Sequence, residues 1–65
     1  MADPESDPAS GRMAVFAAVV AVQDDGFSVE KARSLVARRF GLSEIAVKAI
    51  EREGLDNLWP PLGEP

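Results

Sequence analysis

The side chains that most often carry catalysis are missing from this chain. It has no histidine, cysteine or tyrosine, so it lacks the commonest general base, the strongest side-chain nucleophile and the soft metal ligands. Asp24 and Asp25 form a carboxylate pair, but two acids at the end of a predicted helix indicate a solvated stop signal. Glu51 and Glu53 lie two residues apart and should diverge on a helix. We therefore expect no enzyme activity, no cofactor, no metal and no small-molecule substrate.

Positive charge is the chemistry that remains. The net charge is -4, yet residues 31 to 52 hold six basic residues against two acidic ones, whereas the rest of the chain holds one against nine. A basic segment between acidic ends is a weak form of the footprint of a phosphate-binding surface. An equally open alternative is that these basic residues only solvate a helix face. They are Lys31, Arg33, Arg38, Arg39, Lys48 and Arg52.

Two short amphipathic helices joined at Gly41 would position these charges. Ser28 can cap a helix over residues 29 to 40, and Ser43 can cap a second helix that starts at Glu44 and should end at Gly54. Gly41 would supply the turn, because glycine tolerates backbone shapes that other residues resist. The spacing of the apolar residues on either side of Gly41 is typical of a helix-turn-helix. The residues expected to hold the pair together are Val36, Ala37, Phe40, Leu42, Val47 and Ile50.

The first helix of the pair should turn one apolar stripe inward and its arginines outward. The inward residues are expected to be Val29, Ala32, Leu35 or Val36, and Phe40, and the outward ones Arg33, Arg38 and Arg39.

An apolar segment, residues 12 to 23, comes before the pair. Its alanines favour a helix, although its valines leave a strand open, and Gly26 is expected to act as the left-handed cap that ends it. A helix that is apolar on nearly every face must be covered on more than one side, so we expect a homodimer or a larger protein partner. Residues 1 to 11 hold two prolines and three acids and are expected to form a disordered leader, if they are native at all.

The C-terminal residues contain the single tryptophan, followed by two prolines that should keep the tail extended. Leu55, Leu58, Trp59 and Leu62 either fold back over the core or present Trp59 as a peptide-like ligand for another protein. Residues 63 to 65 are expected to be a flexible end.

Length and composition set further limits. A 65-residue chain is one domain at most and buries only about 60% of its unfolded surface. Without cysteine it has no disulfide, which fits a cytoplasmic protein. The longest apolar run, residues 13 to 22, is about half the roughly 20 residues that span a bilayer. We expect a soluble all-α domain of three helices with no membrane contact.

The chain resembles the helix-turn-helix superfamily of bacterial DNA-binding proteins over about 24 residues, LVARRFGLSEIAVKAIEREGLDNL. Its second half is similar to the fourth conserved region of bacterial sigma factors, where a GVS turn is followed by a V-x-x-I-E-x-E helix. In that family the second helix enters the major groove and its first turn reads base edges. The resemblance implies that the outward positions are Ser43, Glu44, Ile45, Lys48, Ala49 and Arg52.

Two functions follow as hypotheses. The first is a small DNA-binding protein, a transcriptional regulator or accessory factor, that uses the helix of residues 44 to 53. In it Arg38, Arg39, Lys48 and Arg52 contact phosphates, and Ser43, Glu44 and Lys48 lie nearest the bases. The second is a protein-interaction subunit that docks through residues 13 to 22 and the tail, with Phe16, Val19, Ile45 and Trp59 as contacts. Ile45 could instead be partly buried under the tail around Trp59.

Overall fold

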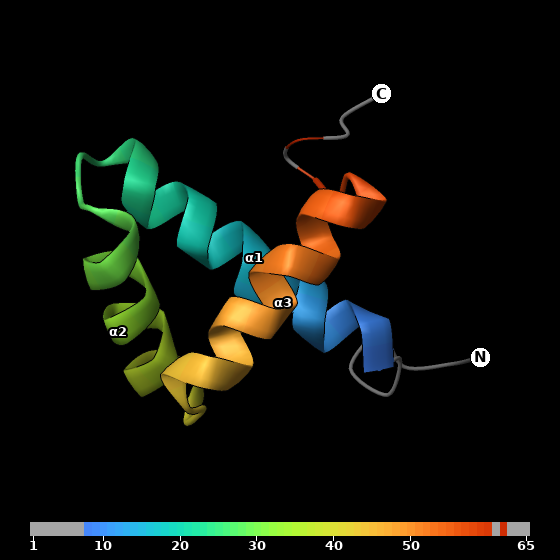
Figure 1. Cartoon of the computed structure of the whole chain (residues 1–65), viewed down its shortest axis with the longest axis horizontal. Coiled ribbons are helices and arrows are strands. Elements are labelled where there is room, and N and C mark those ends of the chain that lie inside the picture. Colours follow the sequence, from blue (N-terminus) through green and yellow to red (C-terminus); the bar gives the residue numbers. More distant parts are fainter. Residues whose placement is uncertain (1–7, 61, 63–65) are drawn as a thin grey trace.

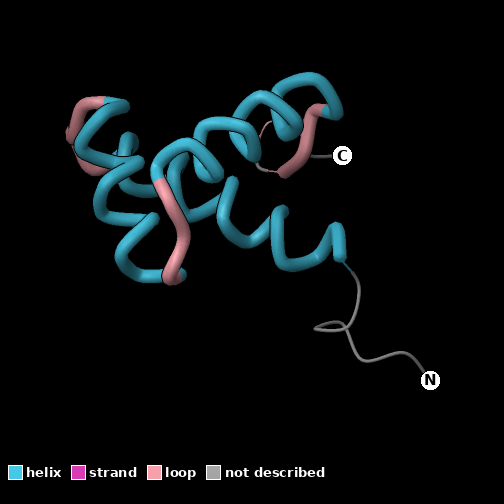
Figure 2. The backbone as a smooth tube through the Cα atoms, turned by 60° about the horizontal axis from the view of Figure 1, so that its bottom comes forward, coloured by secondary structure: helices cyan, strands magenta, loops and turns pink. Residues whose placement is uncertain are grey.

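This computed structural model describes residues 8–60 and 62. These residues contain three helices and no strand. Helix α1 is Pro8–Asp24, α2 is Val29–Phe40 and α3 is Glu44–Asn57. In Figure 1, α3 crosses the middle of α1, and α2 lies beside one end of each; every pair of helices is in contact. The short loops between the helices are visible in Figure 2. The prediction of an all-α, three-helix domain is confirmed.

The first helix begins earlier than predicted. It starts at Pro8, so residues 8 to 11, which were assigned to a disordered leader, are helical. Proline suits the first position of a helix, because its missing N–H is not needed there and its fixed φ is already helical. The rest of the predicted leader, residues 1 to 7, lies outside the described residues. At the other end, Gly26 takes the predicted positive φ, 101°.

The local signals around α2 and α3 act as predicted. The Ser28 hydroxyl accepts a hydrogen bond of 3.1 Å from the Lys31 N–H, and the Ser43 hydroxyl accepts one of 3.0 Å from the Ala46 N–H. Gly41 is left-handed, with φ 69° and ψ 34°. The Leu42 N–H then bonds the Ala37 carbonyl at 2.8 Å, which closes the end of α2. The chain therefore breaks at Gly41 and starts a new, capped helix three residues later.

The core lies where the three helices meet. Its buried side chains are Val15, Phe16, Val19, Ala32, Val36, Ala37 and Val47, with Ile50 packed partly against them. The inward prediction was wrong for Val29 and Phe40, which are 40% and 39% exposed. These two residues are the first and last of α2. A residue at a helix end has neighbours on one side only, so its burial is incomplete.

The prediction that α3 ends at Gly54 was wrong. Gly54 lies buried inside the helix. A Cβ built on Gly54 would stand 2.2 Å from Cδ1 of Phe16. The glycine therefore allows the aromatic ring of α1 to lie directly against the backbone of α3. The helix continues to Asn57 and ends at Leu58, which is left-handed with φ 51°, and the Trp59 N–H bonds the Gly54 carbonyl at 2.9 Å.

The described part of the tail, which ends at Leu62, turns where an extended chain was predicted. The Leu62 N–H bonds the Trp59 carbonyl at 2.9 Å, which closes a turn after α3. Pro60 stands at the second position of this turn, where the fixed φ of proline is favourable. Trp59 packs against Phe16 edge to face, with ring centroids 6.2 Å apart and planes at 81°. Of the two predictions for Trp59, this contact favours the one in which it covers the core.

Candidate functional site

The outer face of α3 carries most of the side chains that the sequence singles out. Ile45, Lys48, Ala49 and Arg52 are all exposed, and their spacing of three and four residues places them on one side of the helix. The opposite side, with Val47 and Gly54, is buried against α1 and α2. A shallow groove runs along the exposed face. It is lined by Arg33, Ile45, Lys48, Ala49, Glu51, Arg52, Leu55 and Asp56.

Ile45 is the most exposed large apolar residue in the described part of the chain, at 82%. It is therefore not buried under the tail around Trp59, which was one of the sequence-based alternatives. Ala49 follows one turn later on the same face and is also exposed. The middle of the face is thus apolar, and Lys48 and Arg52 place positive charge beside it.

Ser43 and Glu44 lie at the start of α3. The Ser43 oxygen accepts the capping hydrogen bond, and its hydroxyl group can still donate one hydrogen bond. Glu44 is exposed in the first turn, where the helix dipole favours a negative charge. It precedes Lys48 by four residues, a spacing that allows the two charges to attract each other. Glu44 thus lowers the positive potential at this end of the face.

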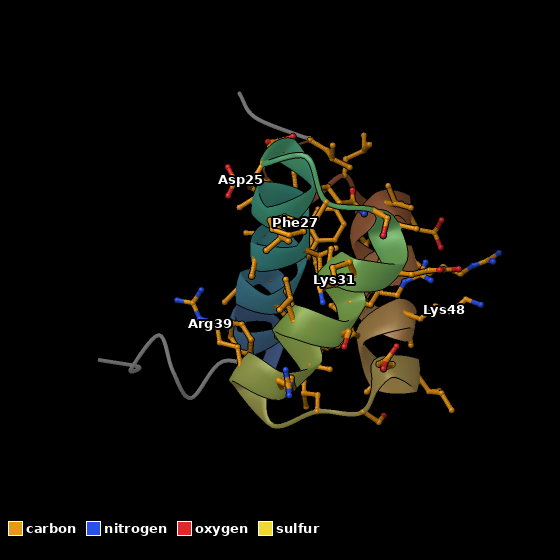
Figure 3. All side chains as sticks on the ribbon, turned by 90° about the vertical axis from the view of Figure 1, so that its left-hand side faces the viewer. Asp25, Phe27, Lys31, Arg39 and Lys48 are labelled. Atoms are coloured by element: carbon orange, nitrogen blue, oxygen red, sulfur yellow. The ribbon has the colours of Figure 1, made fainter. Side chains whose placement is uncertain are left out.

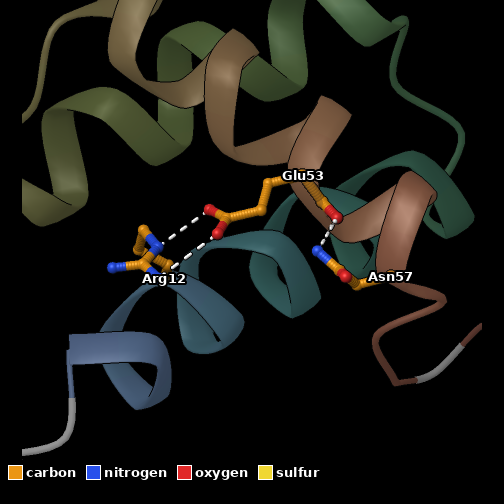
Figure 4. Close-up of polar contacts among 3 residues, drawn as sticks. All are labelled: Arg12, Glu53 and Asn57. Carbon is orange, nitrogen blue, oxygen red and sulfur yellow. Dashed lines mark hydrogen bonds and ion pairs between the residues drawn. The ribbon is translucent and has the colours of Figure 1, made fainter.

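Two ion pairs bind α3 to the other helices, and one of them holds Arg33 partly buried. Arg33 Nε donates to Glu51 Oε2 across the contact of α2 with α3, and the two side chains are only 24% and 13% exposed. Arg12 Nε donates to Glu53 Oε1 at 2.8 Å across the contact of α1 with α3 (Figure 4). The prediction that Arg33 points outward was wrong, because a partly buried guanidinium needs a charged partner, and Glu51 supplies it.

The remaining basic side chains do not form one cluster. Arg38 and Arg39 are exposed in the last turn of α2, as predicted. Figure 3 shows that Arg39 points to one side of the domain, away from α3, whereas Lys48 points to the other side. The structure therefore brings Lys48 and Arg52 together on α3 and separates Arg39 from them.

The structure also separates the predicted partner-binding residues, because some of them are buried and others are exposed. Phe16 and Val19 are 2% exposed and belong to the core, so they form no surface in this fold. The reason is that α1 lies against both other helices, and its outward side presents the small residues Ala14, Ala17 and Ala21. After Ile45, the most exposed large apolar side chains of the described residues are those of Leu55, Leu58 and Leu62, at 57%, 63% and 48%. Helical spacing continued past Gly54 could have placed Leu55 on the outer face.

The described residues contain no group of three or more acidic, histidine or cysteine side chains that could hold a metal ion. None of the helices there has the length and apolar character needed to cross a membrane. Comparison with protein families, with curated proteins and with solved structures finds no match for this chain.

Proposed function

We propose that α2, the turn at Gly41 and α3 act as a helix-turn-helix that binds duplex DNA, with α3 in the major groove. The observation that carries the proposal is the division of α3 into two sides. One side is packed on α1 and α2, and the other is exposed along its length with Lys48 and Arg52 one turn apart. An α-helix with its side chains is about 10–12 Å wide, and the major groove is about 12 Å wide, so the exposed side fits it.

In this arrangement the charged residues have separate roles. Lys48 and Arg52 contact phosphates, because both carry positive charge on the face that approaches the DNA. Ser43 and Glu44, at the N-terminal end of α3, lie nearest the base edges, where a carboxylate can accept from the amino group of cytosine. Arg39 points to the other side of the domain and takes no part in this contact. Such a module suits a transcriptional regulator or an accessory factor.

The proposal is tested by the anisotropy of a fluorescent duplex titrated with the full chain over a range of salt concentrations. Two phosphate contacts predict that log K falls with log salt with a slope of about -2, since each neutralised phosphate releases a counterion. Lys48→Ala and Arg52→Ala should each weaken binding and reduce the slope by about one. Arg39→Ala is the matched control and should leave both quantities unchanged. No binding at low salt, or an equal loss with Arg39→Ala, would refute the proposal.

A second candidate is a protein-interaction subunit that keeps the same scaffold. The observation that favours it is the exposed apolar area on Leu55, Leu58 and Leu62 at the end of α3. Phe16 and Val19 no longer support it, because both are buried. Self-association through this end would appear as a mass above that of one chain in sedimentation equilibrium, and Leu55→Asp should abolish it. A single-chain mass at all concentrations excludes association of the chain with itself.

A further inference from the structure

We propose that Ile45 and Ala49 make the outer face of α3 selective for thymine, by contacting the 5-methyl groups of two thymines in the major groove. The inference rests on the DNA-binding function proposed above and names what that site reads. Ile45 carries no polar atom, and a side chain that is 82% exposed gains stability only from a partner that covers it. The thymine methyl is the apolar group that base edges offer in the major groove.

The spacing of the two residues selects the spacing of the thymines. Ile45 and Ala49 are four residues apart, which corresponds to about 6 Å along a helix that rises about 1.5 Å per residue. Successive base pairs are separated by about 3.4 Å. The two side chains therefore match methyl groups about two base-pair steps apart. Lys48, which lies between them in the sequence, is exposed on the same face and is left to contact a phosphate.

The small size of this apolar area argues for a nucleic-acid partner over a protein partner. It comprises Ile45 and Ala49, with Leu55 at the far end of the same groove, and it is bordered by the exposed charges of Glu44, Lys48 and Arg52. A stable protein interface covers about 800 Å² on each partner and excludes charge from its centre. Two methyl contacts between phosphate-binding cations need far less area, and this is the pattern on α3.

The experiment starts from duplexes selected by the full chain out of a random-sequence pool at low salt. The best duplex is then resynthesised with deoxyuridine in place of each thymine in turn, which removes one methyl group and leaves the hydrogen-bonding edge unchanged. We expect two positions, about two steps apart, at which the loss weakens binding about fourfold each. This corresponds to ~0.8 kcal/mol per methyl group at ~1.4 kcal/mol per tenfold change.

A double-mutant cycle assigns the contact to Ile45. Ile45→Ala should abolish the methyl dependence at one of the two positions and leave the other fourfold effect intact. The variant should fold, because Ile45 makes little contact within the domain and alanine favours a helix; its circular dichroism verifies this. Lys48→Ala is the matched control, since it should weaken both duplexes equally.

The outcomes separate this inference from the function it rests on. Binding that tolerates deoxyuridine everywhere overturns the thymine contact and leaves DNA binding standing. An Ile45→Ala variant that keeps the full methyl dependence overturns the assignment to Ile45, even if its affinity for thymine and deoxyuridine duplexes falls by the same factor. No binding to any duplex of the pool overturns both proposals together.

Discussion

Replacing Gly54 with alanine tests the packing of α1 on α3 most directly. In an exposed helix the change should stabilise the protein by about 1 kcal/mol, because alanine is the better helix former. Here the added Cβ would meet three atoms of the Phe16 ring at 2.2, 2.5 and 2.6 Å. Ordinary contact begins at 3.4 Å, so the ring would have to withdraw by roughly 1 Å in a packed core.

The ring has little freedom to withdraw. Phe16 is 2% exposed, and Trp59 stands against it edge to face. Forcing an extra carbon into a packed core costs about 1–3 kcal/mol. Subtracting the gain in helix propensity leaves a net loss of about 0–2 kcal/mol, and we expect a value toward the upper end because the ring is confined. For a domain of this size that loss lowers the melting temperature by about 10 °C.

Thermal melts followed by circular dichroism measure this loss, and the fluorescence of Trp59, the single tryptophan, reports on the ring contact. Gly11→Ala is the matched control, because Gly11 also lies in a helix and a Cβ there would meet nothing within 4 Å. It should raise the stability by up to about 1 kcal/mol. Phe16→Leu should cost less in the Gly54→Ala protein than in the parent, since it vacates the contested space. A Gly54→Ala protein that melts at or above the parent temperature would refute the packing described above.

Three further predictions concern charge and helix ends, and each is measured by urea unfolding. Glu51→Gln should cost about 2 kcal/mol, because it leaves the partly buried Arg33 without its anion. Glu53→Gln should cost less than about 1 kcal/mol, because the ion pair of Glu53 with Arg12 is more exposed. Equal losses of stability in the two variants would contradict this ranking. Leu58→Gly should stabilise the protein by about 1 kcal/mol, because it relieves the strain of a left-handed leucine, and a side chain that is 63% exposed loses little packing. A lower free energy of unfolding in this variant would show that the Leu58 side chain does pack. Ser43→Ala should cost about 1 kcal/mol by removing the cap of α3, and no change would mean that water replaces the hydroxyl.

The correct and incorrect sequence predictions differ in how far apart the interacting residues are. Ser28, Ser43 and Gly41 act on backbone atoms only three to five residues away, so their types and positions were sufficient to locate the ends of α2 and the start of α3. Gly54 was misassigned, because a glycine that ends a helix and one that admits a neighbouring ring look alike in the sequence. Only the position of Phe16 on α1 distinguishes the two.

The candidate site shows the same division. The resemblance to the helix-turn-helix superfamily placed Ile45, Lys48, Ala49 and Arg52 on the outward side of α3. Their spacing agrees with it, because spacing along a helix decides which residues share a face. Periodicity did not show that Arg33 would be paired, because its partner Glu51 lies on another helix. Periodicity also did not show that Arg39 and Lys48 point to different sides of the domain, because the periodicity of one helix does not give its angle to another helix.

The sequence by itself determined three helices, two of their caps, the break at Gly41 and the residues that line the outer face of α3. The tertiary structure alone decided that Gly54 and Phe16 touch, that Phe16 and Val19 are unavailable to a partner, and which arginines remain at the surface. The physical reason is that caps and turns satisfy backbone groups within a few residues, whereas burial and ion pairing depend on side chains that meet only after the helices have packed.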